Sequence, residues 1–315
     1  EGSNRVKISQ PGHILSLEIV PETDENGDIL AINPLDLPSL LTGNNNQVET
    51  NLTVNNQNKV QLNNNIIPNQ PSINIVSGNI DTSNLNSGNN GGNIYVLGDL
   101  VGLIDNAQIS SNGDIGGGNI YIGGDYQGQG TIPNASQTFV GNNVTLNANA
   151  INNGDGGTVI LWSDENTSFY GNINAKGGAN SGDGGFVEVS GKQSLTYNGL
   201  VDLTAPQGQV GNLLLDPSDI TISNTTDGSD IIFNNSTLTF SGTADSTNLS
   251  TTTLQNQLSL SNVIVTTASS SGIASGNISV DSDITWSSGN TLSLVADNDI
   301  NVKADISYGG NSSSA

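Results

Sequence analysis

The strongest constraint on the fold is a short segment that recurs five times with the same chemistry at the same positions. The copies are GGNIYVLG (91–98), GGNIYIGG (117–124), GGTVILWS (156–163), GGFVEVSG (184–191) and VGNLLLDP (210–217). They align without gaps, and their first residues lie 26, 39, 28 and 26 positions apart. Recurrence of this kind is typical of a repeat architecture, in which each unit packs only against its neighbours.

Alternate positions of the repeat differ in polarity. The fourth position holds Ile94, Ile120, Val159, Val187 and Leu213, and the sixth holds Val96, Ile122, Leu161, Val189 and Leu215. The third and fifth positions are mixed and partly polar. Because successive side chains of a strand point to opposite faces, we expect the aliphatic columns to face the core. A second set of strands is expected at 107–110, 147–151, 172–176 and 200–204.

A strand, a turn, a second strand and a Gly-rich corner, repeated along the chain, predict an all-β fold. The specific prediction is a parallel β-helix (β-solenoid) with coils of roughly 20–28 residues, in which each winding pairs with the next. The 39 glycines suit corners that need a positive φ angle, and an aromatic content of only 4% suits a narrow aliphatic core. A β-sandwich is the main alternative, but it has no reason to keep the same column chemistry at a fixed period.

The chain divides by composition into four segments. Residues 1–43 differ from the rest and hold four of the nine prolines, residues 44–71 form Asn-rich transition coils, and residues 72–222 carry the core repeats. Residues 223–315 are a Ser/Thr-rich continuation whose final coil is expected to be truncated, as in a fragment of a longer rod. Elements expected outside the repeat are strands at 6–8, 14–19, 52–54, 60–62, 276–280, 284–286 and within 291–306, a helical turn or loop at 35–41 and a short helix at 249–260.

The amino-acid composition excludes several classes of function. The chain has no Cys and one His, so Cys-type zinc sites, thiolate nucleophiles and His-based metal cages are excluded. Six basic residues against 29 acidic ones give a net charge of −23, which does not suit nucleic acid. No apolar run approaches the roughly 18 residues of a membrane span, so the chain is not expected to be membrane-spanning.

The block TIPNASQTFVGNNVTLNANAINNGDGGTVILWSDENTSFYGNINAKGGANSGDGGFVEVSGK (131–192) resembles a known family. With GNLLLDPSDITIS (211–223), LSTTTLQNQLSLSNVIV (249–265) and ITWSSGNTLSL (284–294), it is similar to filamentous-haemagglutinin-like exoproteins of two-partner secretion systems, a group that includes the high-molecular-weight adhesins. RVKISQPGHILSLEI (5–19) and LGDLVGLID (97–105) fit as well, so the likeness covers nearly the whole chain.

The resemblance implies a right-handed parallel β-helix that is secreted from, or displayed on, the outer surface of a Gram-negative bacterium. It also implies export by an outer-membrane β-barrel transporter that recognises an N-terminal secretion domain, of which residues 1–43 are the tail or the following junction. The implied activity is adhesion, aggregation, biofilm or extracellular matrix structure. The partners would then be glycans or proteins of host cells, neighbouring cells or matrix.

Two sets of residues are candidates for binding. Asp155 and Asp183 occupy the same Gly-Asp-Gly-Gly corner one coil apart, so a Ca²⁺ ion could lie between their carboxylates. Turn-forming Asp is the alternative interpretation, and no other cofactor is expected. Tyr95, Tyr121 and Trp162 could stack on sugars, whereas coverage of a sheet face by a loop is the structural alternative.

An enzyme is not expected, although some β-helices act on polysaccharides. Glycoside hydrolysis needs two carboxylates about 5–10 Å apart. The outward acids Glu188 and Asp202 have no second acid in register on a neighbouring copy, and Lys176 and Lys192 are the only nearby cations for lyase chemistry. The remaining alternative is a passive stalk that presents a distant toxin or adhesive tip.

Overall fold

The computed structural model describes residues 73–226, 247–268 and 274–310 in full, together with the backbone of several short strands. These are β1 (Val6–Ile8), β2 (Leu17–Ile19), β3 (Leu52–Val54), β4 (Val60–Leu62), β5 (Asn65–Ile66), β22 (Ile232–Asn234) and β23 (Thr239–Ser241). The chain forms two compact units, one of residues 1–72 with 234–239 and one of residues 73–233 with 240–315.

In the first unit, β1 pairs with β2 and β3–β4–β5 form a second sheet, all antiparallel. The strands predicted at 6–8, 52–54 and 60–62 are therefore present, and residues 17–19 of the one predicted at 14–19 form β2. The helical turn or loop predicted at 35–41 lies outside the described residues.

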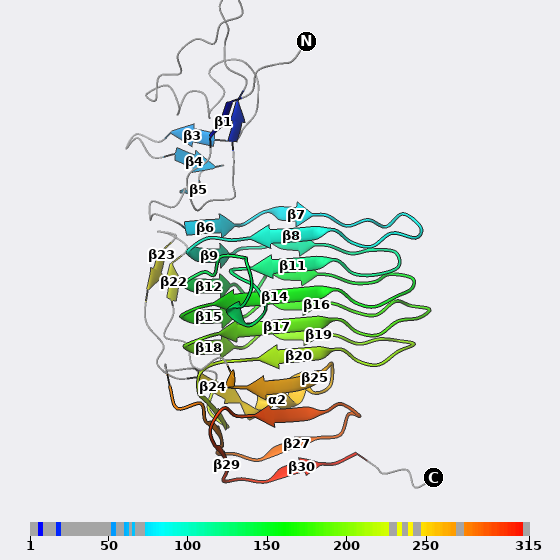
Figure 1. Cartoon of the computed structure of the whole chain (residues 1–315), viewed down its shortest axis with the longest axis vertical. Helices are drawn as coiled ribbons and strands as arrows, with labels where there is room; N and C mark the ends of the chain where they lie inside the picture. Colours follow the sequence, from blue (N-terminus) through cyan, green and yellow to red (C-terminus); the bar gives the residue numbers. More distant parts are fainter. Residues whose placement is uncertain are drawn as a thin grey trace, which may run out of the picture. The chain divides into compact units, whose positions relative to one another are not determined.

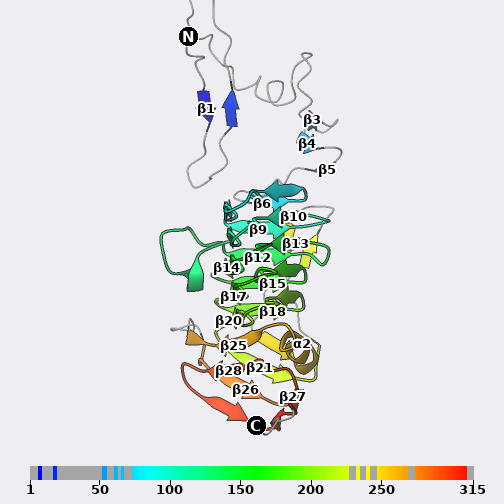
Figure 2. The same ribbon diagram turned by 90° about the vertical axis from the view of Figure 1, so that its right-hand side faces the viewer.

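Up to Leu215, the second unit is built from three parallel sheets, to which each winding contributes one strand (Figures 1 and 2). The first sheet contains β8 (Asn93–Val96), β11 (Asn119–Ile122), β14 (Thr158–Ser163), β17 (Phe186–Gly191), β20 (Asn212–Leu215), β25 (Asn262–Thr266) and β28 (Leu292–Val295). The second contains β6 (Ile73–Val76), β9 (Leu100–Leu103), β12 (Gln137–Val140), β15 (Asn166–Phe169) and β18 (Ser194–Tyr197). The third contains β7 (Asn79–Asp81), β10 (Gln108–Ser110), β13 (Thr145–Asn147), β16 (Asn172–Asn174) and β19 (Leu200–Asp202).

The aliphatic columns stack in register, as the repeat predicts. Ile120 lies between Ile94 on one winding and Val159 on the next, and Val159 pairs in turn with Val187. Each of these four side chains is at most 4% exposed and belongs to one continuous core. The predicted fold class, a parallel β-helix, is confirmed.

Two details differ from the sequence analysis. The strand predicted at 147–151 is β13, two residues earlier, so that Asn147 pairs with Asn174. A shift of two residues keeps every side chain on its own face, which is why the polarity pattern did not reveal it. The whole second sheet was also missed as a repeated element, because its strands (LVGL, QTFV, NTSF, SLTY) do not alternate in polarity.

Residues 154 and 182 occupy the same corner on adjacent windings, and both positions require glycine. Gly182 has a φ of +108°, and a Cβ there would lie 1.9 Å from the carbonyl oxygen of Gly154. Gly154 has a φ of +82°, and its Cβ would lie 1.7 Å from the carbonyl oxygen of Ile115. Both the backbone conformation and the close approach of successive windings therefore exclude a side chain.

After Leu215 the pattern changes. A further parallel sheet contains β21 (Ile220–Ser223), β24 (Thr247–Ser250), β26 (Ile278–Val280) and β29 (Ile300–Val302), and β27 (Ile284–Trp286) pairs with β30 (Ile306–Tyr308). The predicted helix is α2 (Thr251–Gln257), whose N-terminus is capped by the Ser250 hydroxyl. The side-chain amide of Gln257 accepts from the backbone N–H of Val201 and donates to its carbonyl oxygen. In this way α2 pairs with the edge of β19, the last strand of the third sheet.

Candidate functional site

The outer face of the first sheet carries the chemistry of this chain, because its outward columns change character from one winding to the next. The fifth repeat position is Tyr95, Tyr121, Ile160, Glu188 and Leu214 on five successive windings. The first two are accessible, whereas the other three are at most 4% exposed. The face therefore divides into an open tyrosine pair and a covered region.

The open part is a tyrosine stack. The rings of Tyr95 and Tyr121 lie 5.1 Å apart between centroids and are tilted by only 8°. Tyr95 is 48% exposed, so part of the stack faces solvent. The in-register winding sets this geometry, since each ring stands above the same position of the next strand. The exposed ring surface of Tyr95 can pack against the apolar face of a sugar ring.

The covered part lies beneath a loop of residues 124–136, here called the covering loop. It replaces the three-residue connection 97–99 of the preceding winding and joins β11 to β12. The loop contains a short 3₁₀ turn, η2 (Tyr126–Gly128), and projects to one side of the stacked strands in Figure 2. It accounts for most of the extra length of the 39-residue interval in the repeat, where an inserted loop or an additional strand is expected from the sequence.

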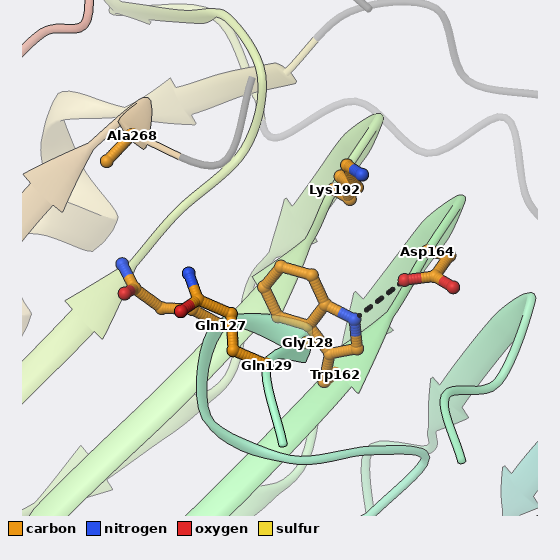
Figure 3. Close-up of a pocket in the computed structure, with 7 residues that line it drawn as sticks. All are labelled: Gln127, Gly128, Gln129, Trp162, Asp164, Lys192 and Ala268. Atoms are coloured by element: carbon orange, nitrogen blue, oxygen red, sulfur yellow. Dashed lines mark hydrogen bonds between the residues drawn. The ribbon is translucent and has the colours of Figure 1, made fainter. Parts of the chain in front are cut away.

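Trp162 lies directly under this loop. Its side chain is only 1% exposed, and its indole N–H donates to Asp164 at 3.1 Å (Figure 3). Gly128, with a φ of +62°, approaches the indole so closely that a Cβ would lie 2.6 Å from it. Trp162 is therefore not accessible for stacking on a sugar while the covering loop is in place.

A pocket of about 210 Å³ opens beside the indole and is lined by Gln127, Gly128, Gln129, Trp162, Asp164, Lys192 and Ala268 (Figure 3). Sites for small organic ligands usually measure about 300–1,000 Å³. This pocket is below that range, so it suits a few water molecules better than an organic ligand.

Glu188 is the most perturbed acid of the covered region. Its side chain is fully buried, and both carboxylate oxygens accept from the backbone N–H of Gln127, at 3.0 and 3.2 Å. Burial raises the pKa of Glu188 to about 8, and the nearby Asp216 and Asp125 carboxylates act in the same direction. Hydrogen bonds from Gln127 and Ser190 oppose that rise in pKa without cancelling it. The side chain is therefore largely protonated at neutral pH.

A second buried acid joins the same network. The side-chain amide of Gln127 donates to Asp216 at 2.9 Å, so one loop residue bridges carboxylates of two windings. The sequence analysis missed this pairing, because the residue in register with Glu188 is Leu214 and Asp216 lies two positions further along. Since both carboxylates are fully buried, no substrate reaches them in this conformation.

The two corner aspartates form a ladder with the backbone. Asp155 accepts from the backbone N–H of Asp183 at 2.8 Å, and Asp183 accepts from that of Gln209 at the same distance. Each carboxylate thus closes the corner of the following winding. Within residues 73–226, 247–268 and 274–310, no group of three acidic or His side chains could hold a metal ion. The calcium site between Asp155 and Asp183 stays a prediction.

Comparison of the chain with protein-family models and with curated proteins finds no match. No helix in the described part of the chain is long and apolar enough to cross a membrane.

We expect the stability of the chain to fall with rising pH, and Glu188→Gln to remove that dependence. The folded pKa of about 8 lies above the ordinary 4.5. Between these values the folded chain keeps a proton that the unfolded chain has released. The free energy of unfolding should then decrease by up to about 1.4 kcal/mol per pH unit in that window. Urea unfolding of both proteins at pH 5, 6.5 and 8 measures this, and parallel pH dependences would show that Glu188 is not the responsible group.

Proposed function

We propose that this chain is part of a secreted or cell-surface exoprotein of the filamentous-haemagglutinin-like type, acting in adhesion, aggregation or extracellular matrix structure. The parallel β-helix supports the proposal, because it is the fold that the resemblance implies. A net charge of −23 and the absence of Cys are compatible with a chain that is exported unfolded by a β-barrel transporter at the outer membrane. The segment would act on the outside of the cell and would have no catalytic role.

The observation that carries the adhesive role is the exposed Tyr95–Tyr121 stack. A solenoid presents side chains at regular intervals along an extended face, and aromatic rings supply large contact areas with little loss of conformational freedom. Tyr95 keeps nearly half of its surface in solvent. Trp162 on the same sheet, in contrast, is shielded by the covering loop and is only 1% exposed.

The experiment that tests the adhesive role compares beads coated with the chain and with variants, measured for retention on bacterial or epithelial cell layers. Tyr95→Ala/Tyr121→Ala should reduce retention roughly tenfold, which corresponds to about 1.4 kcal/mol of contact energy. Tyr308→Ala is the matched control, because Tyr308 is also exposed (55%) and also packs on a ring, that of Trp286. Equal retention of wild-type and albumin-coated beads would instead favour the passive-stalk alternative.

A further inference from the structure

A second candidate binding surface lies at the corner that follows the third sheet. Asn147 and Asn174 end β13 and β16, and the groove continues over Asn149, Ile151 and Lys176. It spans three windings, since Pro206 of the next winding also lines it, and it is an open groove of about 440 Å³. It is larger and more open to solvent than the pocket beside Trp162.

The floor of the groove carries side-chain amides held in place by the winding itself. The Nδ2 of Asn174 donates to the Oδ1 of Asn147 at 3.0 Å. The Oδ1 of Asn149 accepts from the backbone N–H of Lys176 at 2.9 Å, and its Nδ2 donates to Asn112 at 3.0 Å. An Asn amide has two N–H donors and two lone pairs on oxygen. The ladder uses part of this capacity and orients the remainder, so the amides are preorganised to bond a ligand.

Apolar atoms lie next to the amides. Ile151 is 43% exposed, and Ala179 and Pro206 line the same groove. Asn147, Asn149 and Ile151 alternate with the buried Ala148 and Ala150, so the strand parity directs all three outward. The surface therefore offers hydrogen bonds on one side and an aliphatic contact on the other, as the equatorial hydroxyls and C–H faces of a pyranose require.

The charge of Lys176, which lines the groove, is neutralised by an ion pair. The Nζ of Lys176 lies 2.6 Å from the Oδ2 of Asp202 on the next winding. Although burial opposes it, the hydrogen bonds from Lys176 and Thr204 lower the pKa of Asp202, so the ion pair persists at neutral pH. An acidic ligand would meet a neutralised cation within a chain of net charge −23, which disfavours its approach.

The amides repeat along the groove. Successive windings are about 4.7–4.9 Å apart, so a ligand that lies along the stack of windings can meet side-chain amides of more than one winding. We propose that this groove binds a neutral oligosaccharide that lies along the stack of windings. The proposal goes beyond the adhesive role of the tyrosine stack, because it concerns another sheet and holds whether or not the chain is exported.

The test is isothermal titration of the purified chain with cellotetraose, chitotetraose and mannotetraose as neutral probes, and with tetragalacturonate as the acidic one. At least one neutral tetrasaccharide should bind, and Asn147→Asp should weaken it tenfold or more. The new carboxylate still accepts from Asn174, but it has no N–H to donate to a ligand hydroxyl and also loses the long contact, at 3.5 Å, from the Asn147 Nδ2 to the Ser110 hydroxyl. Asn93→Asp is the matched control, because the Oδ1 of Asn93 likewise accepts from Asn119, at 2.8 Å, on the first sheet.

Unchanged affinity in both Asn93→Asp and Tyr95→Ala/Tyr121→Ala would place the ligand in the groove rather than on the tyrosine stack. The proposal is overturned if no neutral tetrasaccharide binds, if tetragalacturonate binds more tightly, or if the Asn93 or tyrosine variants weaken binding as much as Asn147→Asp. Tighter binding of a capped tetra-alanine peptide than of every sugar would also overturn it, because the groove would then recognise extended peptide backbone.

Discussion

Replacing Ile120 with alanine should lower the free energy of unfolding by about 2–5 kcal/mol. Ile120 is fully buried and lies between Ile94 and Val159 in the aliphatic column. Its truncation leaves a cavity in a stack where neighbouring windings have little freedom to collapse, because backbone hydrogen bonds fix their separation. Urea unfolding followed by far-UV circular dichroism measures the loss.

Asn119→Ala is the matched control for this experiment. Asn119 precedes Ile120 in β11 but points outward, where its amide donates to Asn93 at 2.8 Å. Loss of one partly exposed hydrogen bond should cost about 1 kcal/mol or less. Equal effects of the two substitutions would mean that the alternate residues of β11 do not face opposite sides.

Gly182→Ala should produce a comparable or larger loss of stability, although it adds only one methyl group. The φ of +108° strains any residue that has a Cβ, at a cost of about 1–3 kcal/mol. The new Cβ would also overlap the Gly154 carbonyl oxygen at 1.9 Å, so two windings must move apart, which adds about 1–3 kcal/mol. Together the two effects predict a loss of about 2–6 kcal/mol, measurable as a lower urea midpoint.

Gly78→Ala separates this effect from the general cost of replacing glycine. Gly78 precedes β7, where a Cβ would have no heavy atom within 4 Å and where φ is not positive. Its substitution should change the free energy of unfolding by no more than about 0.5 kcal/mol. A small effect at Gly182 would contradict the close approach of successive windings at the Gly-Asp-Gly-Gly corner.

The sequence predicts the first sheet well, because there the hydrophobic period of two coincides with the repeat. Ile94, Ile120, Val159 and Val187 could be aligned by their chemistry alone, and they stack as expected. The second sheet could not be recognised in this way. Its strands contain buried Thr, Ser and Asn side chains, such as Thr138 and Ser168, so polarity does not report burial there.

The covered site could be predicted only in part. Trp162 was noted as an aromatic residue of the repeat, but its burial depends on the covering loop, whose path is not encoded in any periodic pattern. Glu188 and Asp216 meet through Gln127, a residue 61 and 89 positions away from them in sequence. Contacts of this range depend on tertiary structure, and the sequence offers no local signal for them.

The groove over Asn147, Asn149 and Lys176 also depends on structure that the sequence does not determine. The two-residue difference in register at β13 determines that Asn147, rather than Asn149, lies beside Asn174. Both alignments place Asn next to Asn, so the sequence alone favours neither. The connection lengths before and after each strand decide the register, and those lengths vary between windings.

The in-register stacking of the windings can be measured as the distance between nitroxide labels along one outward column, since the chain has no Cys and labels attach only where Cys is introduced. Asn93, Asn212 and Asn262 occupy the same position on three windings, with Asn212 four windings from Asn93 and Asn262 five. Double electron–electron resonance on the pairs 93/212 and 93/262 should give backbone separations of about 19 and 24 Å, in steps of about 4.8 Å per winding. Equal distances, or a shorter one for 93/262, would contradict the in-register stack.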